Sequence, residues 1–249
     1  MERERLGTVA VAVGALLVVG TLLVSAIAAP TIGASSDGGE RQVLVGVQGG
    51  GPGWHEYGNV HLLEDGDEVW REDGADSYFE VERLEDGTVL ASFMHSGYEE
   101  CGPYEAPCTR TGFRVIDPSG DEPAVVSEYS YPVRTPKNSE VHAAKPLDGG
   151  GIVVTDMERE RIVVVEDGEA VWEWRASELY TAPEDPTSRD WLHINDVDVI
   201  GEGRFLVSVR NANQLVVVER GAGVVEVINE DTDDSDDGDC TQFSQLADT

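Results

Sequence analysis

Two of the five histidines, His142 and His193, occupy matching positions in similar segments of the sequence, 51 residues apart. Each begins an apolar segment that is followed by a glycine-containing turn and a second apolar segment. Because the charge of an imidazole changes near neutral pH, this side chain serves as nucleophile, general base or hydrogen-bond donor. A single histidine in this position commonly caps a strand, whereas two equivalent ones favour a shared site.

Arg210 ends the segment that returns from His193 through the turn at residues 201–203. A two-residue turn would place His193 and Arg210 on one face of the hairpin, and a three-residue turn would make them face apart. If they converge, a guanidinium beside imidazoles forms an anion site suited to oxyanions such as sulfate esters. The alternative for Arg210 is a surface ion pair with a nearby carboxylate.

These segments belong to a repeat that organises most of the chain. Glycines at the same point of four similar hairpins, namely Gly66, Gly120, Gly168 and Gly221, are 54, 48 and 53 residues apart. A second hairpin precedes each of the last three, so four short strands recur in every repeat. The pattern predicts an all-β fold, with the blades of a β-propeller as the preferred architecture and a β-sandwich as the alternative.

The first repeat contains only three candidate strands, at residues 42–47, 59–64 and 67–71, so its innermost strand is missing. No later segment supplies that strand, because residues 229–249 form an acidic tail for which we expect disorder. We therefore expect a partial propeller of about four blades over residues 42–228. Its open edges would allow self-association or pairing with another chain.

The composition is strongly acidic, with 49 Asp and Glu against 17 Lys and Arg and a formal net charge of −32. This charge repels phosphate backbones, which excludes nucleic acid as a partner. An acid-rich, lysine-poor surface stays hydrated in concentrated salt and is typical of halophilic proteins. The 40% apolar content excludes a wholly disordered chain.

The N-terminal segment, residues 1–30, is predicted to be a transmembrane anchor. Residues 6–29 carry no charge and are long enough as a helix to cross the bilayer. Arg3 and Arg5 precede them, which predicts a single-pass cell-membrane protein whose body is extracellular. The small residues at 25–29 leave a cleaved signal peptide and a secreted protein as the alternative. Residues 31–41 form a linker.

The positions of the cysteines are consistent with an exported protein. Cys101 and Cys108 bracket a loop of turn-forming residues, which predicts a disulfide between them outside the reducing cytosol. A metal site is disfavoured because no second Cys/His pair at ligand spacing accompanies them. Cys240 is left unpaired, and neither a metal nor another cofactor is predicted.

Residues 190–199, followed by a Gly-x-Gly turn and residues 205–211, resemble the arylsulfate sulfotransferase family in its haloarchaeal form. The segment that begins at His142 and ends in Trp-Glu-Trp at 172–174 is similar to the preceding blade of that family. The resemblance covers roughly residues 43–233. It implies a six-bladed propeller that moves a sulfuryl group from an aryl sulfate to a phenol through a sulfohistidine.

The resemblance also implies roles for single residues. His193, Arg210 and His142 match catalytic residues that hold the sulfuryl oxygens, and Asn195 and Asn211 beside them are expected to bind substrate. The family's nucleophilic histidine lies further downstream, after a Gly-Glu-Asp-like segment. Here a similar segment begins at residue 229, and no histidine follows it. We therefore expect a C-terminally shortened form of the family.

Two functions follow from these observations. The first is a membrane-anchored, extracytoplasmic arylsulfotransferase-like protein with small aryl sulfates and phenols as substrates. Trp54 and His55 could then help to bind an aromatic acceptor, although local packing explains them equally well. The second is a non-catalytic cell-surface propeller that acts as a binding or interaction module, since the expected nucleophile is missing.

Overall fold

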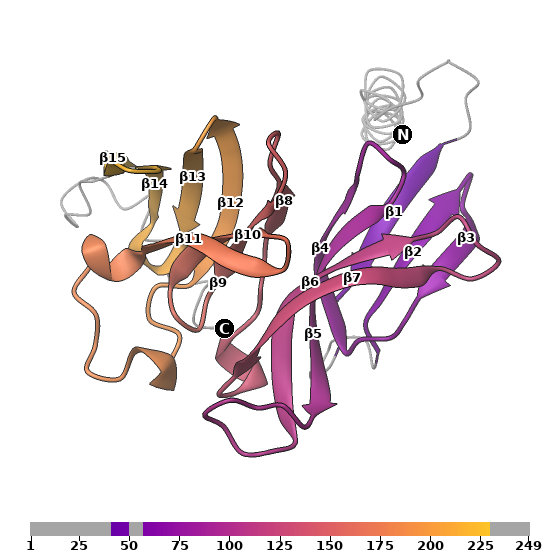
Figure 1. Cartoon of the computed structure of the whole chain (residues 1–249), viewed down its shortest axis with the longest axis horizontal. Helices are drawn as coiled ribbons and strands as arrows, with labels where there is room; N and C mark the ends of the chain where they lie inside the picture. Colours follow the sequence, from indigo (N-terminus) through magenta and orange to yellow (C-terminus); the bar gives the residue numbers. More distant parts are fainter. Residues whose placement is uncertain (1–40, 50–56, 230–249) are drawn as a thin grey trace, which may run out of the picture. The chain divides into compact units, whose positions relative to one another are not determined.

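The computed structural model describes residues 41–49 and 57–229, which form four antiparallel sheets in chain order (Figure 1). The first sheet has three strands: β1 (Gln42–Val47), β2 (Asn59–Glu64) and β3 (Asp67–Glu72). The second contains β4 (Ser77–Arg83), β5 (Val89–Tyr98), β6 (Cys108–Asp117) and β7 (Ala124–Val133). The third contains β8 (Ala144–Pro146), β9 (Ile152–Asp156), β10 (Arg161–Glu166) and β11 (Glu169–Arg175). The fourth contains β12 (Ile194–Gly201), β13 (Arg204–Val209), β14 (Gln214–Glu219) and β15 (Gly223–Ile228).

The predicted all-β class is confirmed, and so are the hairpins. The β2–β3 and β10–β11 turns are Asp-Gly pairs in which both residues have positive φ: 51° and 97° at Asp65 and Gly66, 50° and 78° at Asp167 and Gly168. Positive φ at both central residues defines the type I′ turn, whose twist matches that of the flanking strands. The first sheet has three strands, as expected, and β3 ends one residue later than predicted.

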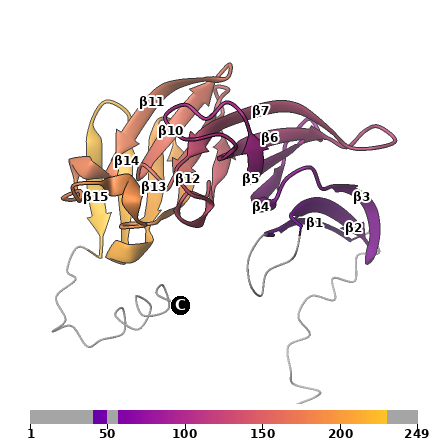
Figure 2. The ribbon, with the colours of Figure 1, turned by 90° about the horizontal axis from the view of Figure 1, so that it is seen from below.

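Neighbouring sheets pack face to face, because each of the three core clusters joins sheets that follow one another in the chain (Figure 2). The position of strand β10 between two neighbouring sheets explains why its sequence is a continuous apolar run. Val163 and Val165 face the second sheet, while Ile162 and Val164 face the fourth. A strand with both faces buried needs apolar residues at every position. This packing is compatible with a propeller-like fold.

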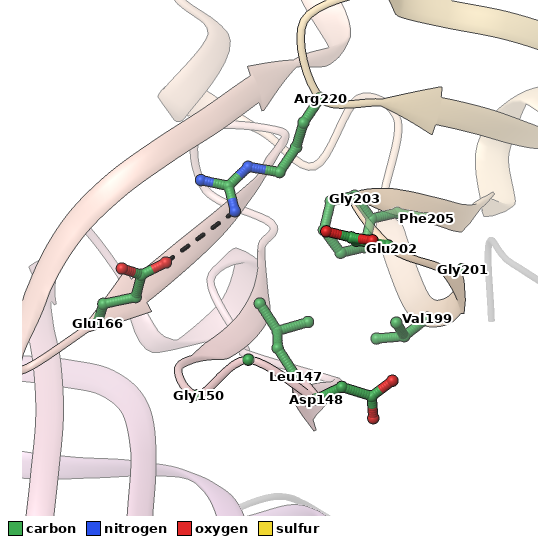
Figure 3. Close-up of a pocket in the computed structure, with 11 residues that line it drawn as sticks. Leu147, Asp148, Gly150, Glu166, Val199, Gly201, Glu202, Gly203, Phe205 and Arg220 are labelled. Carbon is green, nitrogen blue, oxygen red and sulfur yellow. Dashed lines mark ion pairs between the residues drawn. The ribbon is translucent and has the colours of Figure 1, made fainter.

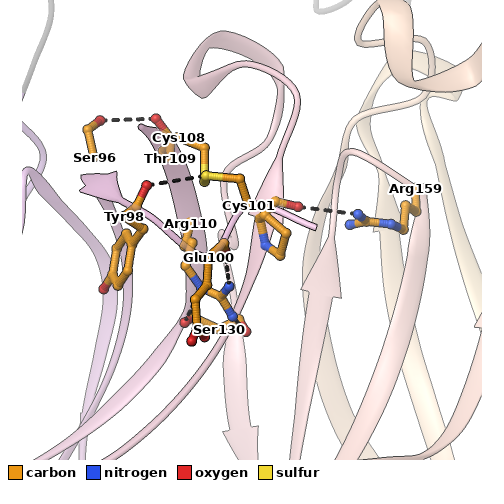
Figure 4. The surroundings of a disulfide bond; sticks show 10 residues. Ser96, Tyr98, Glu100, Cys101, Cys108, Thr109, Arg110, Ser130 and Arg159 are labelled. Atoms are coloured by element: carbon orange, nitrogen blue, oxygen red, sulfur yellow. Dashed lines mark hydrogen bonds between the residues drawn. A yellow bond between two sulfur atoms is a disulfide. The ribbon is translucent and has the colours of Figure 1, made fainter. Parts of the chain in front are cut away.

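The predicted disulfide is present between Cys101 and Cys108, whose Cα atoms are 5.7 Å apart (Figure 4). It closes the loop between β5 and β6. Arg110 stabilises the same loop, since its guanidinium donates to the carbonyl oxygen of Glu100 at 2.8 Å and, through Nε, to the hydroxyl of Ser130 at 3.0 Å. The loop is therefore tied at its base to β6 and β7.

Four single-turn 3-10 helices complete the described chain: η1 (Pro136–Asn138), η2 (Ala176–Glu178), η3 (Pro186–Ser188) and η4 (Arg210–Ala212). Among the described residues, no helix has the length and apolar character that crossing a membrane requires. The predicted anchor at 1–30, the linker up to residue 40, Trp54, His55, and the tail from residue 230 with Cys240 lie outside the described residues.

Candidate functional site

His142 and His193 lie together, although they belong to different sheets. Each precedes the first strand of its sheet, β8 and β12 respectively, which begin at Ala144 and Ile194. Their ring centroids are 4.9 Å apart and the ring planes are inclined by 30°. The ring of Phe79, from β4 of the second sheet, meets His142 edge-on at 5.4 Å. First strands of three successive sheets thus contribute to one cluster.

Asp190 orients the ring of His193. Its Oδ2 atom lies 2.5 Å from Nδ1 of His193. Because a carboxylate only accepts hydrogen bonds, this contact places the proton of a neutral imidazole on Nδ1 and the lone pair on Nε2. The Nε2 atom is buried and has no hydrogen-bond partner among the described residues. His193 therefore has a buried acceptor atom without a hydrogen-bond partner inside the cluster.

Arg210 reaches the same carboxylate from η4, which directly follows the returning strand β13. The β12–β13 turn has two residues, since Gly201 pairs with Arg204. The backbone N–H of Arg210 donates to the carbonyl oxygen of His193 at 3.2 Å, and its Nη2 lies 3.6 Å from Oδ2 of Asp190. The Arg210 side chain is 38% exposed, against 9% for His193. The guanidinium is thus the member of the cluster that faces solvent.

The charges of the cluster are set by burial. Burial, followed by electrostatic repulsion from His193 in its protonated form and from Arg210, lowers the pKa of His142 to about 4. His142 is therefore neutral at pH 7. Burial also raises the pKa of Glu140, a second carboxyl group near Asp190 and His193. The cluster combines one guanidinium, a neutral imidazole and an aspartate-bound imidazole with acidic neighbours.

The two predicted asparagines differ in their relation to this cluster. Asn211 is exposed; its Oδ1 lies 3.4 Å from Nε of Arg210, and its backbone N–H donates to Leu192 at 2.9 Å. Asn195 is partly buried at the bulge where β12 leaves the regular register, between Ile194 and Asp196. A substrate-binding role for either residue stays a prediction, and so do the catalytic roles of the histidines and Arg210.

Sequence reasoning missed three members of the site. Asp190 carries a usable signal, because it precedes His193 by three residues in the same loop. Phe79 begins the hairpin that corresponds to those of His142 and His193 in the preceding repeat, so the repeat marks its position, whereas Glu160 carries no local signal. Glu160 lies 33 residues before His193, and its carboxylate accepts hydrogen bonds from three consecutive backbone N–H groups beginning at Leu192.

A cavity of 440 Å³ lies elsewhere, between the hairpin tips of the third and fourth sheets (Figure 3). Its wall includes Leu147 and Phe205, and Arg220 lies 4.0 Å from Glu166 at its rim. Strand β12 runs from the histidine cluster at its start to Gly201 in this cavity at its end. The cavity is thus separate from the histidine cluster and shares none of its residues.

Comparisons with known proteins leave the family open. No family model matches the sequence, and no curated protein matches it. One similar solved structure is a protein of unknown function from Bacteroides caccae, with 12% identity and a TM-score of 0.46. The match covers 70% of this chain and 56% of the other, so this chain spans about half of that protein. A likeness of this degree does not bear on function.

Proposed function

We propose that this protein is an arylsulfotransferase-like enzyme with part of a six-bladed propeller, which moves a sulfuryl group from an aryl sulfate to a phenol. The observation that carries the proposal is the convergence of the two histidines and Arg210, 51 and 17 residues apart in sequence, around Asp190. The sequence resemblance implies that these three residues hold the sulfuryl oxygens, while the nucleophilic histidine of the family would lie further downstream. Sulfuryl transfer needs donors aimed at the sulfuryl oxygens.

The charge of the cluster suits a monoanion. A sulfate monoester carries one negative charge, whereas a phosphate monoester carries close to two at neutral pH. Arg210 shares its positive charge with Asp190, and His142 is neutral at pH 7. A dianion would therefore meet too little positive charge and would be repelled by the neighbouring carboxylates. This balance favours sulfate esters over phosphate esters.

In the proposed reaction, the guanidinium of Arg210 donates to the sulfuryl oxygens. The hydroxyl oxygen of the acceptor phenol attacks sulfur, and its proton moves to Nε2 of His193. The bond from sulfur to the donor's aryl oxygen breaks, the leaving phenolate takes a proton from solvent, and the imidazolium of His193 then returns its proton to solvent. Asp190 stabilises the imidazolium that forms, because its carboxylate lies 2.5 Å from the Nδ1–H group.

The test is transfer from para-nitrophenyl sulfate to phenol by the full chain in concentrated salt. We expect turnover that His193→Ala and Arg210→Ala each lower by about 10²-fold or more. His95→Ala is the matched control, since His95 also contacts an aspartate but lies outside the cluster. If the unmodified chain turned over no faster than the His193→Ala variant, the enzyme function would be excluded for this chain.

We also propose that residues 1–30 anchor the protein in the cell membrane with its body outside, as their uncharged run favours. Fractionation of the full chain and of a variant lacking residues 1–30 tests this. The full chain should sediment with membranes, and the shortened chain should be soluble. Recovery of both in the soluble fraction would argue against the anchor.

The second candidate function is a non-catalytic surface module that binds aryl sulfates. One observation favours it: Nε2 of both histidines is buried, and Arg210 is the cluster member most open to solvent. Calorimetric titration with para-nitrophenyl sulfate separates the two candidates. Binding that Arg210→Ala abolishes, without turnover, would support the module over the enzyme.

A further inference from the structure

A buried carboxylate links the third sheet to the histidine of the fourth. Glu160 is 1% exposed and lies in the turn between β9 and β10. Its Oε1 accepts the backbone N–H groups of Leu192 at 2.9 Å and His193 at 2.8 Å, and its Oε2 accepts that of Ile194 at 3.0 Å. Three consecutive donors therefore converge on one side chain.

This convergence depends on an uncommon backbone conformation. His193 has a φ of +55°, in the left-handed region that non-glycine residues rarely adopt. A left-handed residue within a short segment turns successive N–H groups to one side and forms a concave anion-binding nest. Here the anion is internal, because the carboxylate of Glu160 occupies the nest. Without it, three buried donors would lack partners.

The same conformation aims the ring of His193. The centroid of its ring lies 4.9 Å from that of His142, and its Nδ1 lies 2.5 Å from Oδ2 of Asp190. Glu160 is itself fixed, since its carbonyl oxygen accepts the N–H of Ala176 at 2.8 Å. The third sheet thus holds a rigid carboxylate against the loop that carries the histidine.

We propose that Glu160 is a positioning residue, which holds the backbone of His193 in the conformation that brings its ring onto Asp190 and His142. Any catalytic consequence rests on the function proposed above. The positioning itself does not, and it is tested without substrate. It also accounts for an acidic side chain at a buried position, where an unpaired carboxylate would be costly.

Glu158 provides a matched control for this test. It lies in the same turn and is 2% exposed, and burial raises the pKa of both Glu158 and Glu160. Its partners are different, however, because it accepts from the hydroxyl of Tyr104 at 3.2 Å and from the backbone N–H of Arg134, and it contacts Arg159 at 3.1 Å. None of these three residues belongs to the histidine cluster. The two glutamates thus share burial and differ in what they hold.

The experiment compares Glu160→Gln with Glu158→Gln by NMR of the histidine rings in the full chain. An amide accepts with its oxygen only, so the nest loses at least one bond in Glu160→Gln. We expect changed His193 ring shifts in that variant, with wild-type ring shifts in Glu158→Gln. Equal His193 behaviour in both variants, at a similar loss of melting temperature, would overturn the proposal.

A measurement on the unmodified protein keeps the proposal testable if Glu160→Gln does not fold. The amide protons of Leu192, His193 and Ile194 should lie downfield, exchange slowly and shift together as one carboxyl group titrates. Independent or absent shifts would contradict the nest. Failure of the sulfate-transfer assay would leave this result unaffected, so the two proposals fail separately.

Discussion

The described chain contains two histidine–aspartate pairs with the same contact and different surroundings. In the first, Nδ1 of His95 lies 3.0 Å from Asp76, and the two side chains are 38% and 44% exposed. In the second, Nδ1 of His193 lies 2.5 Å from Asp190, and the exposed fractions are 9% and 20%. Both aspartates precede the first strand of a sheet, so the two pairs start from similar positions in the repeat.

The surroundings decide what each pair is able to do. Asp76 also accepts the backbone N–H of Ser96 at 2.8 Å, and the ring of His95 meets Tyr98 edge-on, which makes this pair a local support for the end of β5. Solvent screens such an exposed pair. Asp190 instead sits among buried groups that come from several sheets. Burial and convergence, rather than the contact itself, make the second pair a candidate site.

The largest expected effect is on the rate of the proposed sulfuryl transfer, when Asp190 and Asp76 are each replaced by asparagine. Asp190→Asn should lower sulfate transfer by about 10³-fold, because the introduced amide can donate to Nδ1 and so favours the tautomer with its proton on Nε2. Asp76→Asn should leave the rate within about twofold, since nothing in the cluster depends on it. Steady-state assays of both variants in concentrated salt measure the difference. Equal losses would show that burial does not distinguish the pairs.

The next effect concerns the stability of the buried cluster in acid. The pKa of His142 is about 4 in the folded protein, against 6.5 for the free side chain. The unfolded chain therefore binds the proton first, and folding stability falls as the pH falls from about 6.5 to about 4. This shift corresponds to a loss of about 3 kcal/mol.

The loss of folding stability in acid should disappear in His142→Gln and should remain in His95→Gln. Denaturant unfolding of both variants and the parent across this pH range measures the effect. Burial also raises the pKa of Glu140, Glu158 and Glu160, so their protonation contributes to the pH dependence as well, and the decisive quantity is the difference between each variant and the parent. An unchanged acid dependence in His142→Gln would mean that the protonated ring is accommodated in the cluster.

The sequence predicted the elements better than their junctions. Asp65-Gly66 and Asp167-Gly168 identify hairpins because few other residues tolerate two positive φ values in succession. The equivalence of His142 and His193 follows from the repeat alone. By contrast, β12 has register irregularities between Ile194 and Asp196 and again near its end, and these change which side chains share a face. No local sequence signal specifies them.

Long-range contacts account for what sequence reasoning could not supply. Glu160 and His193 are 33 residues apart and meet only because the third and fourth sheets pack against each other. Asp190 was visible beside His193, but its role depends on a loop conformation in which φ of His193 is +55°. A non-glycine residue in that region is set by tertiary contacts rather than by local propensity.

Removing the disulfide near the exposed His95–Asp76 pair should have a smaller effect on stability. Cys101 and Cys108 enclose a short loop next to β5, the strand that carries His95. Opening a loop of this length costs about 2.5 kcal/mol in the chain-entropy model. We expect Cys101→Ser/Cys108→Ser to lower the free energy of unfolding by about that amount and to move the NMR signals of His95. The signals of His193 should stay unchanged, and a shift there would show that the two regions are coupled.

The smallest effect is loss of the exposed pair itself. Asp76→Ala removes the contact with His95 and the hydrogen bond from the backbone of Ser96. Because both groups then reach water, the free energy of unfolding should fall by only about 0.5–1 kcal/mol. Denaturant unfolding measures this, with Asp190→Ala as the buried counterpart. That variant should lose about 1–3 kcal/mol, since it leaves the buried Nδ1–H group of His193 without an acceptor. Equal losses in the two variants would mean that the environment of Asp190 is as accessible to water as that of Asp76.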